Sequence, residues 1–213
     1  MKYPLIFFCF LITTQAIAQD PSDLVDLEKI NPGFVFDMRY ATDNNFIGEQ
    51  VYPQSRCFLR YEAAVRLDSV QKELETIALG LKIFDGYRPL EVQRQMWEVM
   101  PDSRYVANPY EGGSRHNRGA AVDVSLVDST GKELKMPTGF DDFSERAHQD
   151  YMELPSNVRR NRWILRTVME KYGFTAITSE WWHYDLKGWQ KYDIIDVPLD
   201  SLYNTDFIYP VEH

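Results

Sequence analysis

The sequence predicts an α+β fold. Amphipathic helical segments stand before and after several short strand-like runs, and the two kinds of segment do not alternate regularly as they would in a doubly wound sheet. No internal repeat, low-complexity tract or linker divides the chain. Residues 19–213 are therefore predicted to form a single domain, preceded by a signal peptide at residues 1–18.

The N-terminal segment has the three parts of a secretory signal. Lys2 gives it a positive start, residues 4–12 are almost all apolar, and small residues surround Ile17. The apolar run is too short to span a membrane comfortably. We therefore expect cleavage before Gln19 and an exported protein, periplasmic or secreted, with no membrane anchor after cleavage.

Charge and cysteine content exclude several classes of partner and site. The chain has 32 acidic residues against 23 lysines and arginines, a net charge of −9, which argues against nucleic acid as a partner. Cys57 is the only cysteine beyond the leader, so an intrachain disulfide and a thiolate metal site are both excluded. We expect Cys57 to be a buried thiol without a catalytic role.

Hydrophobic periodicity predicts two strands and two helices in the first half of the chain. Residues 34–42 alternate apolar and polar side chains, as a strand does. Residues 79–89 read as a short buried strand ended by glycine and proline. Helices are expected at 90–100 and at 61–78, where one stripe combines Ala64, Leu67, Val70, Leu74 and Ile77.

The second half is expected to contribute two further strands and a long helix. Residues 119–128 form a strand with alternating faces, and a loop-rich insertion follows at 135–155. Ser156 is predicted to cap a helix that Gly173 ends. Residues 174–186 resemble a last core strand with a turn or bulge near Ser179.

Three polar residues are candidates for a metal site. Asp123 lies among apolar residues of a predicted core strand, where an unpaired carboxylate is costly. His116 precedes it by seven positions, and His183 lies among aromatic residues. Two imidazoles and one carboxylate are a typical ligand set for hydrolytic zinc, with one position left open for water. Each residue alone also fits a simpler interpretation, a solvent-facing aspartate or a hydrogen-bonded histidine.

Two further residues suggest catalytic chemistry. Glu180 precedes His183 by three positions, and a turn would bring both to one site, where Glu180 would be a general base beside the metal. Arg88, in the turn after a predicted strand, would stabilise an oxyanion, with Asp85 orienting it or a histidine. A surface or capping arginine is the alternative for Arg88.

These residues together resemble the zinc D,D-peptidase family. SRHNRGAAVD is similar to the motif S-x-H-x-x-G-x-A-x-D, and EWWHY to E-x-x-H. DMRYATDNNFIG, VYPQSRCFLR and FDGYRP resemble the D-alanyl-D-alanine dipeptidases within it, and the similarity runs over roughly residues 30–205. The resemblance implies the fold shared with the hedgehog domain, a small central antiparallel sheet flanked by helices.

The resemblance also implies roles for individual residues. It implies Zn²⁺ as the cofactor and hydrolysis of D-alanyl-D-alanine, a small D,D-dipeptide, as the activity. Its zinc ligands would be His116, Asp123 and His183, with Glu180 as base and Arg88 stabilising the transition state. It places Ser114 near the substrate, and Asp141, or alternatively Asp142, at the substrate ammonium.

Two other functions remain open at this stage. A D,D-carboxypeptidase or endopeptidase acting on peptidoglycan stem peptides would use the same scaffold. A non-catalytic zinc-binding module is also compatible with the hedgehog-like fold, but such a module has no need of a base at Glu180.

Overall fold

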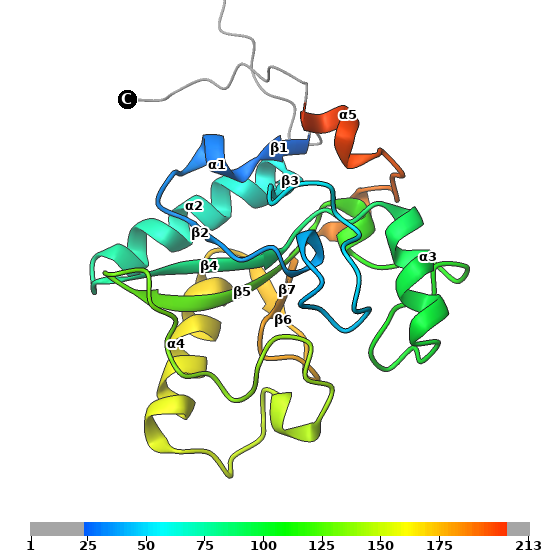
Figure 1. Ribbon diagram of the computed structural model, residues 1–213. Helices are drawn as coiled ribbons and strands as arrows, with labels where there is room; N and C mark the ends of the chain where they lie inside the picture. Colours follow the sequence, from blue (N-terminus) through cyan, green and yellow to red (C-terminus); the bar gives the residue numbers. More distant parts are fainter. Residues whose placement is uncertain (1–23, 204–213) are drawn as a thin grey trace, which may run out of the picture.

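A five-stranded sheet forms the centre of the molecule. The computed structural model describes residues 24–203, and Figure 1 shows the sheet with its helices. The strand order is β2-β4-β5-β7-β6, with β2 parallel to β4 and every other neighbouring pair antiparallel. The predicted α+β class with a small, mainly antiparallel sheet is confirmed. The strands are β2 (Val35–Phe36), β4 (Leu79–Asp85), β5 (Ala121–Asp128), β6 (Phe174–Ala176) and β7 (His183–Leu186).

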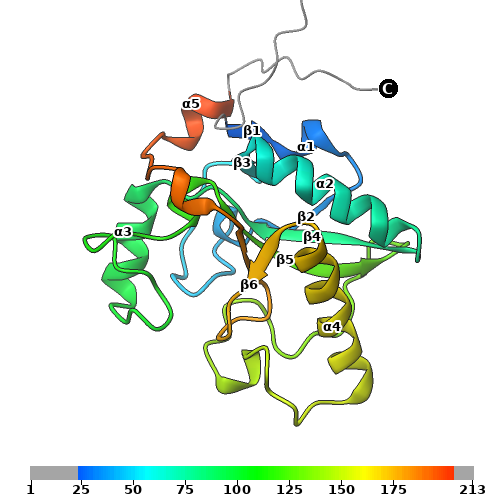
Figure 2. The same cartoon turned by 180° about the vertical axis from the view of Figure 1, so that it is seen from behind.

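Helices and a second, small sheet surround this centre. Helices α2 and α4 contact each other and the main sheet, and both stand in front of it in Figure 2. Helix α3 lies beyond the C-terminal end of β4. The helices are α1 (Leu27–Ile30), α2 (Tyr61–Glu75), α3 (Leu90–Val99), α4 (Ser156–Lys171) and α5 (Leu199–Tyr203). The small antiparallel sheet pairs β1 (Leu24–Asp26) with β3 (Phe58–Arg60). Short 3-10 turns occur at Arg39–Ala41, His116–Arg118, Glu145–Ala147 and Trp189–Lys191.

Strand β5 is covered on both faces. It pairs with β4 on one side and β7 on the other, and its first seven residues are all buried. Val122 and Val124 lie on one face, and Ala121, Asp123 and Ser125 on the other, as the alternation predicted. A carboxylate therefore sits in the middle of the core. The solvent-facing alternative for Asp123 is wrong, since its residue is only 3% exposed.

The predicted strand at 34–42 is wrong over most of its length. Only Val35 and Phe36 pair with β4, and the chain then turns into the 3-10 segment Arg39–Ala41. Asp37 explains the change of direction, because its carboxylate accepts hydrogen bonds from Arg39 and from Lys82 of β4. The alternation of polar and apolar residues after Phe36 therefore belongs to a turn, which the ion pairs of Asp37 with Arg39 and Lys82 stabilise.

Two other helix boundaries differ from the predictions, and a third agrees. Helix α2 ends at Glu75, and Ile77 is 55% exposed in the turn that Ala78 makes with a φ of 57°. Ser156 does not cap α4: it is the first helical residue, after Pro155, and no side chain caps the helix. Gly173 does end that helix, with a φ of 88°.

The predicted last strand is a hairpin of two strands. β6 and β7 pair antiparallel, with Phe174 opposite Leu186, and the loop 177–182 joins them around Ser179. The turn was predicted, but the second strand was not, since the continuous aromatic run gave no sign of the chain reversal. This hairpin sets Glu180 in a loop and His183 at the first position of β7.

Cys57 is buried, as predicted, with 1% of its residue surface exposed. Within residues 24–203, no helix is both long and apolar enough to cross a membrane. The predicted signal peptide and its cleavage site lie outside the described residues.

Candidate active site and metal centre

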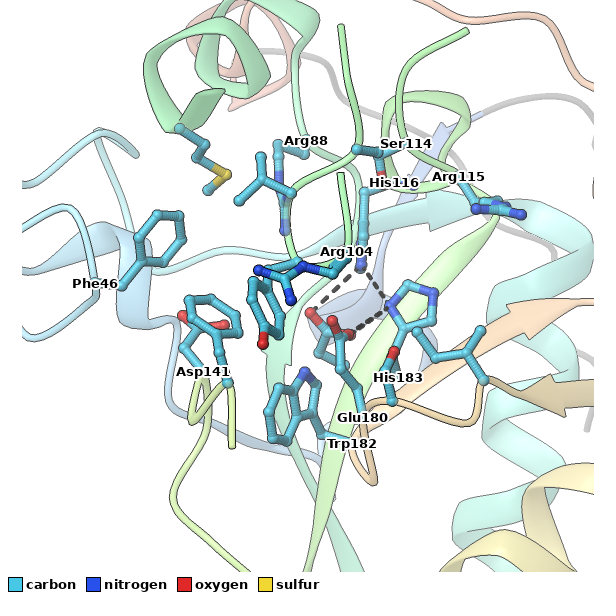
Figure 3. Close-up of a pocket in the computed structure, with 18 of the residues that line it drawn as sticks. Phe46, Arg88, Arg104, Ser114, Arg115, His116, Asp141, Glu180, Trp182 and His183 are labelled. Carbon is cyan, nitrogen blue, oxygen red and sulfur yellow. Dashed lines mark hydrogen bonds and ion pairs between the residues drawn. The ribbon is translucent and has the colours of Figure 1, made fainter. Parts of the chain in front are cut away.

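A cavity of about 290 Å³ opens where β5, β7 and the turn after β4 meet. Figure 3 shows side chains from distant parts of the chain converging on it. The lining includes every residue that the sequence analysis assigned to catalysis, metal or substrate: Arg88, Ser114, His116, Asp123, Asp141, Glu180 and His183.

His116 is held by the turn that contains Gly86. Its Nδ1 lies 2.7 Å from the carbonyl oxygen of Gly86. Because a carbonyl oxygen only accepts, Nδ1 carries the proton and the lone pair of Nε2 faces the cavity. Gly119, with a φ of 65°, then turns the chain from the His116–Arg118 segment toward β5. This tautomer is the one that a metal ligand bonded through Nε2 requires.

Asp123 and His183 are brought together by strand pairing. They are directly opposite each other in the antiparallel register of β5 and β7, so their side chains project from the same face of the sheet. His183 Nδ1 lies 2.9 Å from Asp123 Oδ1 and 3.1 Å from His116 Nε2. One potential ligand atom from each of the three residues lies within 4.8 Å of the other two. All three residues are buried.

The electrostatics of this cluster favour a cation. Burial alone would raise the pKa of Asp123, but the neighbouring His116 and a hydrogen bond from His183 hold it below its usual range. Burial alone would lower the pKa of His183, yet hydrogen bonds to Asp123 and Asp185 raise it to about 10. The carboxylates of Asp123 and Asp185 therefore favour a positive charge between them. A proton on His183 supplies this charge when no metal ion is bound.

Glu180 reaches the same cavity from the β6–β7 loop. Its Oε2 lies 3.9 Å from His183 Nδ1, and Figure 3 shows its carboxylate beside the cluster. Burial is the main reason that its pKa rises to about 7. In a regular strand, Glu180 and His183 would point to opposite faces, because they are three residues apart. Glu180 lies in a loop instead, so both side chains can reach the same cavity. The Glu180 carboxylate therefore lies beside the cluster of His116, Asp123 and His183 and is not one of its three potential ligands.

Arg88 is fixed by hydrogen bonds on two sides. Its Nε and Nη2 donate to Asp85 Oδ2 at 3.1 and 2.7 Å, and its Nη1 donates to Gln93 Oε1 at 2.9 Å. Asp85 in turn accepts from the Tyr52 hydroxyl at 2.8 Å. The prediction that Asp85 orients Arg88 agrees with these contacts, and the alternative of a surface or capping arginine is wrong. Three of the five guanidinium N–H groups are used, which leaves two for a ligand.

The two predicted substrate contacts also line the cavity. Ser114 is buried, and its Oγ accepts a hydrogen bond from the His116 amide at 3.2 Å. Asp141 accepts a hydrogen bond from the Tyr40 hydroxyl at 2.9 Å, and burial raises its pKa well above the usual value. Asp142 points elsewhere and caps the Ser144 amide. Of the two candidates, only Asp141 faces the cavity.

Sequence reasoning missed several residues that support this site, among them Tyr40 and Asp185. Tyr40 holds Asp141, and Asp185 Oδ1 lies 2.9 Å from His183 Nε2. A signal existed for Asp185, because residues two apart in a strand share a face. None existed for Tyr40, which is 101 positions from its partner.

The fold and these side chains define a metallopeptidase. The family Peptidase_M15, described as D-ala-D-ala dipeptidase, matches residues 20–200, and the chain belongs to this family. A D-alanyl-D-alanine dipeptidase of Escherichia coli (strain K12) is 37% identical over 176 residues, covering 83% of this chain and 91% of the relative. A D-alanyl-D-alanine dipeptidase of Enterococcus faecium is 33% identical, and the similarity covers 76% of this chain and 90% of that relative.

Two more distant proteins are also similar. The bifunctional D-Ala-D-Ala dipeptidase and D-Ala-D-Ala carboxypeptidase VanXYC of Enterococcus gallinarum is 29% identical, covering 67% of this chain and 71% of its own. A solved structure of VanYB in complex with D-Alanine-D-Alanine aligns with a TM-score of 0.41 at 16% identity, covering 71% of this chain and 85% of that chain.

Proposed function

We propose that this chain is an exported, zinc-dependent dipeptidase that hydrolyses D-alanyl-D-alanine. The observation that supports it most directly is the convergence of three metal-ligand atoms and the carboxylate of Glu180 in one small cavity. The names of the relatives from Escherichia coli and Enterococcus faecium agree with this substrate.

The residues present fit a zinc ion. His116 Nε2, His183 Nδ1 and a carboxylate oxygen of Asp123 are a nitrogen-rich set of three, which zinc in hydrolytic sites prefers. Each histidine has its other ring nitrogen fixed, by Gly86 for His116 and by Asp185 for His183. Zinc bound there would polarise the scissile carbonyl and lower the pKa of water to about 7.

The protein groups supply the proton transfers and hold the substrate. Glu180 accepts a proton from the attacking water and delivers it to the leaving amine. Arg88 donates its two remaining N–H groups toward the carbonyl oxygen as negative charge develops there. Asp141 pairs with the substrate ammonium, and Ser114 lies at the edge of the bound dipeptide. The positions of these side chains around the cavity support these roles.

The shape of the cavity favours a dipeptide over a longer stem peptide. Its volume is about 290 Å³, and a cluster of aromatic side chains lines it: Phe46 and Tyr105 each pack on Phe143, with ring centroids 5.5 and 5.0 Å apart. Because the relative from Enterococcus gallinarum is named for both activities, carboxypeptidase activity is the second candidate function.

Metal analysis with a panel of peptides tests the proposal. We expect purified protein to hold one equivalent of zinc and to cleave D-Ala-D-Ala but not L-Ala-L-Ala. Glu180→Gln should keep the zinc and lose about 10²–10⁴-fold in kcat, the range typical of a lost general base. Glu98→Gln, an exposed site on α3, is the matched control.

Other results would change the assignment. Efficient cleavage of a pentapeptide stem with poor dipeptide turnover would favour the carboxypeptidase. Zinc without any peptide cleavage would favour a binding module, and full activity in Glu180→Gln would remove Glu180 as the base.

Export is proposed from the N-terminal segment. An exported enzyme would meet dipeptides released from the cell wall and could not act on cytoplasmic precursor pools. N-terminal sequencing of protein from the periplasm or medium should give Gln19 as the first residue. Intact Met1 on protein confined to the cytoplasm would contradict export.

A further inference from the structure

A second cavity, of about 500 Å³, lies beside the N-terminal half of α4. It shares no lining residue with the active-site cavity. In Figure 1, α4 is at the lower left, and α3 is at the right, beyond the end of β4. We name this cavity the arginine pocket, after the residues that dominate its lining together with Trp163 and Met152: Arg159, Arg160, Arg162 and Arg166.

The positive charge of the arginine pocket is poorly neutralised. Arg162 is only 5% exposed, and its Nη1 donates to the carbonyl oxygen of His148 at 2.8 Å. Among residues 24–203, no carboxylate forms a salt bridge with Arg162, Arg159 or Arg160, whereas Arg166 pairs with Glu170 at 2.8 Å. A buried guanidinium without a carboxylate is costly. Burial lowers the pKa of Arg162, and repulsion from Arg159 and Arg166 adds to the fall, whereas attraction to the carboxylate of Asp150, which forms no salt bridge with it, only partly opposes it.

The position of these arginines on α4 adds to that cost. The N-terminal end of a helix carries partial positive charge from its unpaired N–H groups, so acidic residues are favoured there. The first turn of α4 has no acidic residue, and no side chain caps it. Arg159 and Arg160 instead follow directly. The chain has a net charge of −9, yet positive charge collects at a helix end where negative charge is favoured. Such departures from the usual pattern are often found at functional sites.

An aromatic and an aliphatic side chain form the apolar part of the arginine pocket. Trp163 is 65% exposed and Met152 is 59% exposed. Large side chains that remain exposed beside unpaired arginines are typical of binding surfaces. The indole ring offers a flat face for an apolar or planar group of a ligand.

We propose that the arginine pocket binds a soluble phosphate-bearing ligand with an adjoining apolar or planar group. A guanidinium binds phosphate oxygens through two parallel hydrogen bonds. Several unneutralised guanidinium groups beside a helix N-terminus suit a phosphate dianion better than a single carboxylate. Arg162 would supply the buried contact, Arg159 and Arg160 the outer ones, and Trp163 the apolar wall.

Titration of the full, zinc-loaded protein with inorganic phosphate and with phenyl phosphate tests this site. Calorimetry at constant ionic strength should give saturable binding, tighter for phenyl phosphate because of Trp163. The double variant Arg159→Gln/Arg160→Gln changes exposed residues only. It should weaken binding at least about tenfold, the loss of one charge-assisted hydrogen bond, and leave peptide cleavage unchanged. Arg94→Gln, a paired surface arginine on α3, should bind as the wild type does.

Each alternative result overturns the proposal. Binding of undiminished affinity in the double variant would place the phosphate outside the arginine pocket. A response that chloride reproduces at equal ionic strength is non-specific screening. Sedimentation with phosphatidylglycerol vesicles, without binding of either soluble phosphate, would make this face a membrane-binding surface instead. Trp163→Ala, which removes the flat aromatic face, should lose the preference for phenyl phosphate, and an unchanged preference would overturn the apolar part of the proposed site.

Discussion

His183 Nε2 lies 2.9 Å from Asp185 Oδ1, two residues further along β7. The carboxylate accepts a hydrogen bond from the Nε2–H group, which directs Nδ1 at Asp123 and His116. Asp185 is itself restrained, since Arg115 Nε lies 3.6 Å from its Oδ2 and the Arg115 guanidinium stacks on Trp189. The orientation of one proposed zinc ligand thus depends on a chain of contacts that leads to the protein surface.

Asp185→Asn tests this dependence. An asparagine presents either a neutral acceptor or a competing donor to Nε2, so His183 becomes a weaker and less well-oriented ligand. We expect zinc affinity to fall about 10–100-fold, the usual effect of removing such a partner. Competition with a chromogenic chelator measures this zinc affinity independently of peptidase activity. Asp43→Asn, at an exposed site, is the control, and unchanged affinity in Asp185→Asn would refute the role.

Gly86→Ala tests how tightly the turn after β4 is packed. An added Cβ would lie 2.4 Å from Cys57 Sγ and 2.8 Å from the Phe58 carbonyl oxygen. Overpacking of this kind costs about 1–3 kcal/mol. Because the Gly86 carbonyl holds His116, zinc affinity should fall as well.

Urea denaturation with a double-mutant cycle measures this effect. Cys57→Ala should recover part of the lost stability in the Gly86→Ala background, since it removes the nearer contact. Gly139→Ala, where a Cβ meets nothing within 4 Å, is the matched control. Equal unfolding free energies for Gly86→Ala and Gly139→Ala would contradict the packing argument.

The central strand and the metal cluster were predictable from local sequence. The run around Asp123 is apolar on both sides, and a strand that is covered on both faces has this pattern. His116 and His183 were identifiable because histidines are few in the chain and these two accompany motif residues. The meeting of His183 with Asp123 depends on the β5–β7 register, which no local pattern specifies.

Contacts between distant segments account for what could not be predicted. Tyr40 approaches Asp141 across 101 positions, and Tyr52 approaches Asp85 across 33. Both tyrosines look like ordinary core aromatics, because a hydroxyl group that finds its partner only in the folded chain leaves no trace in hydrophobic periodicity. The β6–β7 hairpin was missed for a related reason, since buried aromatic residues continue through its loop.

Asp141→Asn tests the proposed ammonium contact. Asparagine tolerates the φ of 59° that Asp141 adopts, so the loop should be preserved. The variant loses the carboxylate whose charged form the substrate ammonium would stabilise against the effect of burial. We expect kcat/KM for D-Ala-D-Ala to fall roughly ten- to hundredfold, as for one hydrogen bond to a charged group, mainly through KM. Tyr40→Phe should act in the same direction. Asp142→Asn should change kcat/KM little, and a larger loss there than in Asp141→Asn would reverse the assignment.

The pH dependence of kcat/KM tests Glu180 as the base. Glu180 works as a carboxylate, so activity is lost as the pH falls through its pKa. Burial raises this pKa from 4.5 to about 7, attraction to His183 opposes the rise, and Asp123 adds to it. A bound zinc ion would favour the carboxylate further and lower the pKa. We therefore expect the acid limb of the zinc-loaded enzyme between pH 4.5 and about 7.

Glu180→Gln separates this carboxylate from the others in the cavity. Its residual activity should lack the acid limb, because glutamine does not titrate, whereas Asp141→Asn should retain the limb at reduced kcat/KM. An acid limb that persists in Glu180→Gln and disappears in Asp141→Asn would assign the titration to Asp141, the other buried carboxyl group whose pKa is raised. Profiles should be recorded at saturating zinc, since protonation of the histidine ligands also releases the metal at low pH.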